Sequence, residues 1–252
     1  MIESYDFTGI GVVVAGTSLI WLVIMISVPL IARRGVRFRG PAISLGVVAQ
    51  VALVIVAFFD QWAIRAVLTA SIAVPVLGWF AEFIGSRTGI PFGKYHYTAR
   101  LQPQVGNVPV VIPFAWLMML PPSWAAAHAV VPDAHPLVTA AVGAFAFTAW
   151  DVYLDPHLVR WEFWTWNESG RYLGIPLKNF FGWFAWAFVI TVVVGPPTLP
   201  IFPLAIVYVL TWLFQFGGHL YFWRWPVSAF AGFIAMGIIA VPVIVQILSR
   251  LT

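Results

Sequence analysis

The chain has 252 residues, of which 62% are hydrophobic and only 9% are charged. Soluble domains have roughly 45–50% apolar and about 25% charged residues, so the composition excludes that class. Cysteine is absent, which excludes a disulfide framework, a thiolate nucleophile and Cys-ligated zinc or iron–sulfur sites. The net charge is +4, but the 13 basic residues are thinly spread and form no patch of the kind that binds nucleic acid.

Apolar segments separated by Gly, Pro and charged residues predict an all-α polytopic transmembrane bundle. One crossing needs about 20 apolar residues, so we expect a single integral-membrane domain, 1–252, with about eight helices. Gly195-Pro196-Pro197 is either a turn between two helices or a break in one re-entrant segment, and the second interpretation leaves seven helices. The expected helices cover residues 8–32, 42–59, 62–84, 108–130, 136–155, 180–195, 199–216 and 226–248.

Basic residues collect in alternate loops of this arrangement. Cytoplasmic loops of membrane proteins carry an excess of Lys and Arg. We therefore expect a multi-pass protein of the cell membrane, with the basic side in the cytoplasm and both termini outside it. The basic side follows the first, third, fifth and seventh helices and holds Arg33, Arg34, Arg37, Arg39, Arg87, Lys94, Arg100, Arg160, Arg171, Lys178 and Arg224.

Two connections on this side do not have the composition of ordinary loops. Residues 85–98 are dense in aromatic, glycine and ionisable residues, and so are residues 151–179. The sequence thus places nearly all of its polar chemistry at one membrane face, where we expect the functional site.

Three carboxylates lie within the expected spans: Glu82, Asp151 and Asp155. An ionisable group in a membrane helix is costly, so it normally faces the bundle interior and is a functional candidate. Asp151 and Asp155 are four residues apart and share one helix face, just before Pro156, which we expect to end the helix. The three carboxylates are expected to converge on one pocket.

Each carboxylate also has a structural interpretation. Asp155 is equally explained as a helix-end or turn residue. Glu82 could be the ion-pair partner of Arg87 or Arg100, since charges within membranes usually pair. A purely structural role is harder to assign to Asp151, which lies a full turn inside the helix.

The aromatic residues of the second connection allow two interpretations. Trp161, Trp164 and Trp166 either belong to the interfacial aromatic belt or line a pocket for a flat or polyene ligand, where their ring faces would stabilise a carbocation. His96 is a candidate positioning partner on the same side. No spacing of His and carboxylate residues indicates a metal site, and we expect no metal and no cofactor.

An apolar site with carboxylic acids suits acid–base chemistry on a lipid-soluble substrate. A carboxyl group at low dielectric tends to stay protonated, which makes it a proton donor. Protonation of an isopropylidene end group gives a tertiary cation. Addition of water then gives a tertiary alcohol, whereas capture by an internal double bond closes a ring.

Four strings carry a resemblance to a known family. The chain resembles the integral-membrane carotenoid 1′,2′-hydratases over roughly residues 79–183; members hydrate the acyclic ψ-end of gamma-carotene or lycopene, or the end groups of bisanhydrobacterioruberin. The resemblance implies hydration without a cofactor, with a carotenoid, water and membrane lipids as partners, and leaves a complex with other carotenoid enzymes open. The strings are Phe92-Gly-Lys-Tyr-His-Tyr-Thr98, Val108-Pro-Val-Val-Ile-Pro-Phe-Ala-Trp116 with Met118-Met119, Asp151-Val-Tyr-Leu-Asp-Pro156, and Gly174-Ile-Pro-Leu-Lys-Asn-Phe-Phe-Gly-Trp183.

The residues themselves suggest roles in such a reaction. As a hypothesis, Asp151 or Glu82 protonates C2′, and the other polarises the water that attacks C1′. Asp155 is the third carboxylate expected at the catalytic site. The residues expected to bind the substrate, position the water or flank the cation are Tyr95, His96, Tyr97, Trp164, Trp166, Asn179 and Arg87.

Three other functions remain open at this point. A carotenoid end-group cyclase needs the same proton donor but excludes water. A membrane prenyltransferase could use Asp151-x-x-x-Asp155 as half of a paired aspartate motif that holds Mg²⁺ on a diphosphate. A carrier or transporter of lipids or carotenoids would explain the hydrophobicity equally well, although it does not call for several carboxylates at one face.

Overall fold

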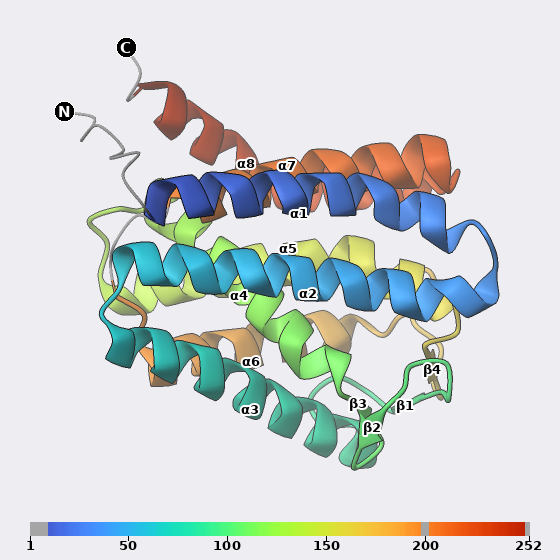
Figure 1. The fold of residues 1–252 in the computed structure, drawn as a ribbon. Helices are drawn as coiled ribbons and strands as arrows, with labels where there is room; N and C mark the ends of the chain where they lie inside the picture. The colour runs from blue at the N-terminus through green and yellow to red at the C-terminus, as the bar shows by residue number, and fades with distance from the viewer. Residues whose placement is uncertain (1–9, 198–201, 250–252) are drawn as a thin grey trace.

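The structure is a computed structural model that describes residues 10–197 and 202–249 (Figure 1). Its eight α-helices confirm the expected ones, with ends that differ by up to six residues; the expected starts at residues 8 and 199 lie outside the described residues. The helices are α1 (Ile10–Ala32), α2 (Val36–Gln61), α3 (Ile64–Thr88), α4 (Val111–Val130), α5 (Pro136–Arg160), α6 (Leu177–Val194), α7 (Phe202–Gly217) and α8 (Pro226–Ser249).

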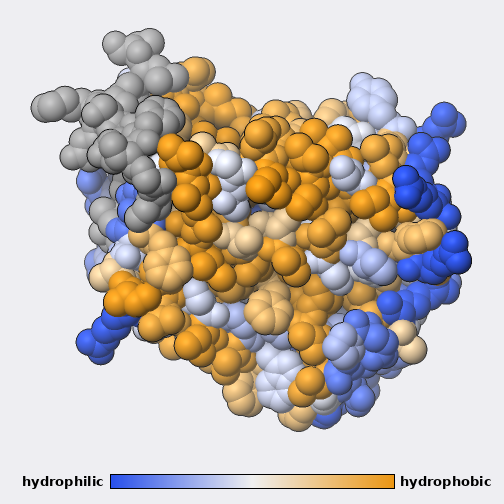
Figure 2. Space-filling view, in the orientation of Figure 1, coloured by the Kyte–Doolittle hydropathy of each residue, from blue (hydrophilic) through white to orange (hydrophobic). Residues whose placement is uncertain are grey.

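The fold is an all-α polytopic bundle. Seven of the described helices, all except α4, are long and apolar enough to cross a membrane. Figure 2 shows hydrophobic residues across the middle of the molecule and hydrophilic residues gathered mainly at the end that carries the strands. Gly195 caps α6 in the left-handed conformation, and α6 and α7 are separate candidate spans. The chain therefore has two helices here, which disagrees with the single re-entrant segment.

Helix α4 is the centre of the bundle. It packs against α2, α3, α5, α7 and α8 and crosses obliquely between them (Figure 1). Every side chain from Trp116 to Ala127 is buried, as expected for a helix that is surrounded by other helices. Because α4 is enclosed, its residues can form the inner wall of cavities near the strands.

The two ends of the bundle differ in character. The start of α1 and the end of α8 lie at one end, and the short strands lie at the other (Figure 1). This placement requires an even number of passes, in agreement with eight helices. The loop between α1 and α2, which contains Arg33 and Arg34, lies at the strand end.

Helix α5 does not end at Pro156, contrary to expectation, and continues to Arg160. Proline cannot donate a hydrogen bond to the carbonyl four residues earlier, which is the carbonyl of Val152. The hydroxyl of Tyr172 donates to that oxygen instead, at 2.9 Å. Membrane helices tolerate proline when a neighbour satisfies the freed carbonyl in this way.

The two polar connections meet in a small antiparallel ladder. Strand β1 (Tyr95–Tyr97) pairs with β4 (Trp164–Trp166), with Tyr95 opposite Trp166 and Tyr97 opposite Trp164. A second two-stranded ladder joins β2 (Gln104–Val105) to β3 (Val108–Pro109) just before α4. The strands thus place aromatic side chains from distant parts of the chain at one end of the bundle.

Phe92 anchors the first connection between α3 and α6. Its buried ring fits against Gly85 on one helix and Gly182 on the other. A Cβ atom at Gly182 would lie 2.7 Å from Cδ1 of Phe92 and 2.9 Å from Cγ of Pro91. Glycine is therefore needed here for close approach rather than for backbone freedom.

We expect Gly182→Val to destabilise the protein by about 1–3 kcal/mol, because the added methyl groups overpack the contact with Phe92. Gly16→Val is the matched control, since Gly16 also lies in a membrane helix and has nothing within 4 Å of its Cβ position. Thermal unfolding in detergent measures both. Equal melting temperatures for the two variants would contradict the proposed packing role.

Candidate functional site

A small cavity of about 50 Å³ lies at the strand end of the bundle. Helices α3, α4, α5 and α6 and both strands of the first ladder contribute to its wall. The three carboxylates expected to converge, Glu82, Asp151 and Asp155, all line it. The other lining residues are Phe92, Tyr95, Tyr97, Ile112, Ala115, Trp116, Met119, Leu154, Leu158, Trp164, Trp166, Asn179 and Trp183.

Glu82 is held by three uncharged donors. The hydroxyls of Tyr95 and Tyr97 donate to its Oε2 at 2.5 Å and 2.7 Å, and the indole Nε1 of Trp116 donates to its Oε1 at 3.1 Å. A carboxylate offers about four lone-pair sites. Glu82 therefore keeps room for one further donor, on Oε1.

Strand geometry explains why two of three consecutive residues reach Glu82. Successive side chains of a strand point to opposite faces, so Tyr95 and Tyr97 point inward and His96 points outward. His96 contacts Asn167 Oδ1 at 2.9 Å and the Thr165 hydroxyl at 2.9 Å. His96 thus lies outside the cavity, on the exposed face of the ladder.

Asp151 and Asp155 share one amide donor. Asn179 Nδ2 donates to Asp151 Oδ2 at 3.0 Å and to Asp155 Oδ2 at 2.8 Å, which uses both of its hydrogens. Trp164 Nε1 donates to Asp155 Oδ1 at 2.8 Å. Asp151 Oδ1 is buried and has no hydrogen-bond partner, so it is the carboxylate oxygen that is free to act on a bound molecule.

The tyrosines outside the spans stay protonated over a wide pH range. Burial raises the pKa of Tyr95 and of Tyr97 well above the usual value, and the nearby charge of Glu82 raises both further. Burial also raises the pKa of Tyr172, which caps the Val152 carbonyl, to about 12. The hydroxyls that hold Glu82 are therefore reliable hydrogen-bond donors.

The ion-pair interpretation of Glu82 is wrong, and so is the helix-end interpretation of Asp155. Arg87 donates to the carbonyl oxygens of Phe83 and Gly106 and lies over the Phe83 ring. It does not line the cavity, contrary to its expected role in substrate binding. Arg100 pairs with another glutamate, and Asp155 lies inside α5, because that helix continues beyond Pro156.

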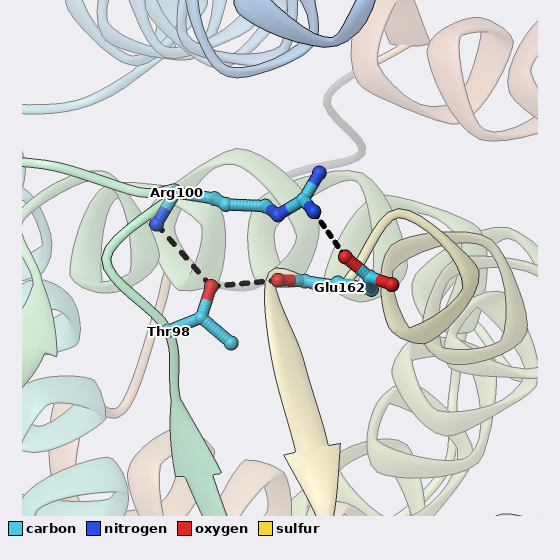
Figure 3. A network of polar contacts seen from close by, with 3 residues as sticks. All are labelled: Thr98, Arg100 and Glu162. Carbon is cyan, nitrogen blue, oxygen red and sulfur yellow. Dashed lines mark hydrogen bonds and ion pairs between the residues drawn. The ribbon is translucent and has the colours of Figure 1, made fainter.

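Two polar clamps outside the cavity fix the ends of the first ladder. At one end the Thr98 hydroxyl donates to the Glu162 carbonyl at 2.6 Å, and Arg100 forms an ion pair with the Glu162 carboxylate (Figure 3). At the other end Glu168 accepts from the Lys94 backbone N–H at 2.7 Å and from Lys178. The hydrogen bond from Lys178 is the main reason that the pKa of Glu168 is lowered.

Aromatic rings form much of the remaining wall. Trp164 and Trp166 line the cavity as expected, but Trp161 lines a neighbouring one. Trp116 and Trp183, whose stacked rings lie 5.1 Å apart, also line the cavity and were not expected there. Both lie in sequence segments that carry the family resemblance, but nothing in the local pattern shows that residues 67 positions apart are in contact.

Most carboxylate oxygens of the cavity already accept a hydrogen bond from a protein side chain. Within the described residues, no three His, Asp or Glu side chains are placed to hold a metal ion. Mg²⁺ requires near-octahedral oxygen coordination, whereas Asp151 Oδ1 is the only oxygen of these three carboxylates without a partner. The donor set fits a proton-transfer site better than a diphosphate–magnesium site.

Comparison with known proteins identifies relatives of the chain. The family model described as carotenoid biosynthesis protein matches residues 40–196. A bisanhydrobacterioruberin hydratase from Haloarcula japonica is 26% identical over 117 residues, which are 45% of this chain and 40% of that relative. The match thus covers about two fifths of the relative's length. No solved structure matches the chain.

We expect Tyr95 and Tyr97 to remain protonated at about pH 11, where an ordinary phenol with a pKa near 10 is mostly ionised. The double variant Tyr95→Phe/Tyr97→Phe should therefore give the same tyrosinate absorbance as the wild-type protein at this pH. After unfolding, the double variant should show less absorbance, by two phenols. A difference already present in the folded proteins would show that these hydroxyls titrate normally.

Proposed function

Because the chain belongs to the carotenoid biosynthesis protein family, we propose that it is a carotenoid 1′,2′-hydratase. It adds water across the terminal C1′=C2′ double bond of an acyclic end group and gives a tertiary alcohol. The observation that carries the proposal is the small cavity that joins three carboxylates to an aromatic and aliphatic wall. The hydratase name of the relative from Haloarcula japonica supports the same reaction.

Asp151 is the proposed proton donor. Two carboxylates that share the Asn179 amide in a buried cavity repel each other when both are charged, so we assign one proton to the pair. The Asp151 Oδ1 oxygen has no partner, and a proton there can reach C2′ of the substrate. The transfer leaves Asp151 ionised and the substrate as a tertiary cation at C1′.

Glu82 is the proposed base. Its three donors leave one acceptor position, where a water molecule can donate a hydrogen bond. When the water oxygen bonds to C1′, its proton passes to Glu82. Return of that proton to Asp151 restores the starting state, so the reaction consumes only the alkene and water and needs no cofactor.

The aromatic wall stabilises the cation between these two steps. Ring faces attract a cation within about 6 Å, most strongly for tryptophan, and four tryptophans line the cavity. The hydrogen bond from Trp164 Nε1 to Asp155 fixes that ring in place. The wall also limits the number of water molecules beside the cation.

We place this site near the cytoplasmic face of the cell membrane. The strand end carries the arginines of the loop between α1 and α2, and positively charged loops stay in the cytoplasm. The polar connections then give water a short route to the cavity, while the apolar substrate arrives from the lipid. Both termini are proposed to lie on the opposite side.

Pigment analysis in a bacterial host that makes lycopene or gamma-carotene tests the reaction. Chromatography with mass spectrometry should show a more polar product that has gained the mass of one water per modified end. An isomeric product of unchanged mass and low polarity would instead indicate ring closure. Unchanged pigments from both substrates would count against hydration of these end groups.

We expect Asp151→Asn and Glu82→Gln each to lower the rate of product formation by about 10²–10⁴-fold, because each removes one acid–base step. Asp133→Asn is the matched control: it changes an exposed carboxylate in the loop between α4 and α5 that does not line the cavity. Product per unit of membrane protein should stay near wild-type for this control. If Asp151→Asn and Glu82→Gln both retain the normal rate, the assigned roles are wrong.

A further inference from the structure

A second cavity, of about 170 Å³, adjoins the carboxylate cavity. It lies between α1, α2, α4, α5 and α7. Ile112 and Ala115 of α4 and Leu154 and Leu158 of α5 line both cavities. These shared side chains are apolar, so a hydrophobic molecule in one cavity could extend into the other where they move apart.

The second cavity is shaped for an apolar chain. Its wall includes Met25 and Val28 of α1 and Val47 of α2. Phe214 of α7 lines the cavity and is 37% exposed, and α7 belongs to a candidate membrane span, so the cavity lies beside a helix that can face lipid. A long hydrophobic molecule could enter there without crossing the polar strand end.

Three polar side chains interrupt the apolar wall of this cavity. They are Trp150, His157 and Thr211, and their Nε1, Nε2 and Oγ1 atoms are buried and have no hydrogen-bond partner. Trp150 and Thr211 are 1% and 2% exposed, and leaving such a group unpaired costs about 1–3 kcal/mol. These atoms lie beneath the accessible surface of the wall, so a molecule in the cavity would contact mainly apolar atoms.

We propose that the second cavity binds the conjugated chain of the substrate next to its reacting end. This inference rests on the proposed function, because the carboxylate cavity has room for an end group but not for a long polyene. The end group passes between α4 and α5 at Ala115 and Leu154, and the chain behind it lies against α1 and α2. The side chains that the two cavities share are all apolar, which suits a hydrocarbon better than water.

Binding of lycopene, measured apart from turnover, tests the assignment. Each protein carries the substitution Asp151→Asn and is purified in detergent from a lycopene-producing host, and bound lycopene per protein is read from its absorbance. Val28→Trp fills the cavity and should lower bound lycopene by about tenfold or more. Val23→Trp is the control, because Val23 lies on the same helix and is 56% exposed.

A second variant tests whether reduced binding in Val28→Trp comes from filling the cavity rather than from a folding defect. A Cβ at Gly46, which also lines the cavity, lies 3.4 Å from Val28 Cγ2, so Gly46→Leu fills the same space from α2 and should also lower bound lycopene. Equal lycopene in both cavity variants and the control, or none in the parent protein, would overturn the proposal. Phospholipid that copurifies with each protein is measured as well. If the cavity variants lose phospholipid but keep lycopene, the cavity binds a lipid tail and the proposal is overturned.

The same experiment separates this proposal from the hydration itself. If the parent protein binds lycopene and Val28→Trp does not, the cavity assignment stands even when cells that express the wild-type protein form no hydrated product. If those cells form the product while Val28→Trp and Gly46→Leu bind lycopene normally, the hydration proposal stands and the conjugated chain of the substrate binds elsewhere.

Discussion

Burial of three carboxylates at the end of an apolar bundle is the constraint on which the rest of the structure depends. An unpaired charge in such surroundings is very costly. The chain meets this cost with neutral donors: two tyrosines, two tryptophans and one asparagine. No Lys, Arg or His is among the described residues that line the cavity. Neutral donors do not lock a carboxylate in its charged form as a bound arginine would, which suits a site that moves protons.

The ladder of β1 and β4 supplies several of these neutral donors. Glu82 needs donors from outside its own helix, and the alternation of a short strand brings Tyr95 and Tyr97 to the same side. The partner strand supplies Trp164 to Asp155. The ladder thus connects the two ends of the acid–base system, and its clamps at Glu162 and Glu168 hold it at the edge of the bundle.

The central helix explains how acid chemistry and a long hydrocarbon can share one small protein. Helix α4 places Ile112 and Ala115 on the boundary between two cavities, and Trp116 beside Glu82. The burial of its segment from Trp116 to Ala127 leaves the outer helices to face the lipid. In the proposed complex, the reacting end and the chain behind it are bound by different walls: one holds the three carboxylates among aromatic rings, and the other has no carboxylate.

The sequence by itself predicted the positions of the helices, because long apolar segments and alternating basic loops reflect local transfer energies. It left open whether the segments on either side of Gly195-Pro196-Pro197 are one helix or two. It also placed Asp151 and Asp155 on one face, since that follows from helical spacing. Only the tertiary structure decided what surrounds them. The continuation of α5 depends on Tyr172, 20 residues from the carbonyl that it caps, and the wall depends on contacts such as Trp116 with Trp183. Contacts between distant residues leave no local pattern, which is why Arg87 and His96 were expected at a site that they do not line.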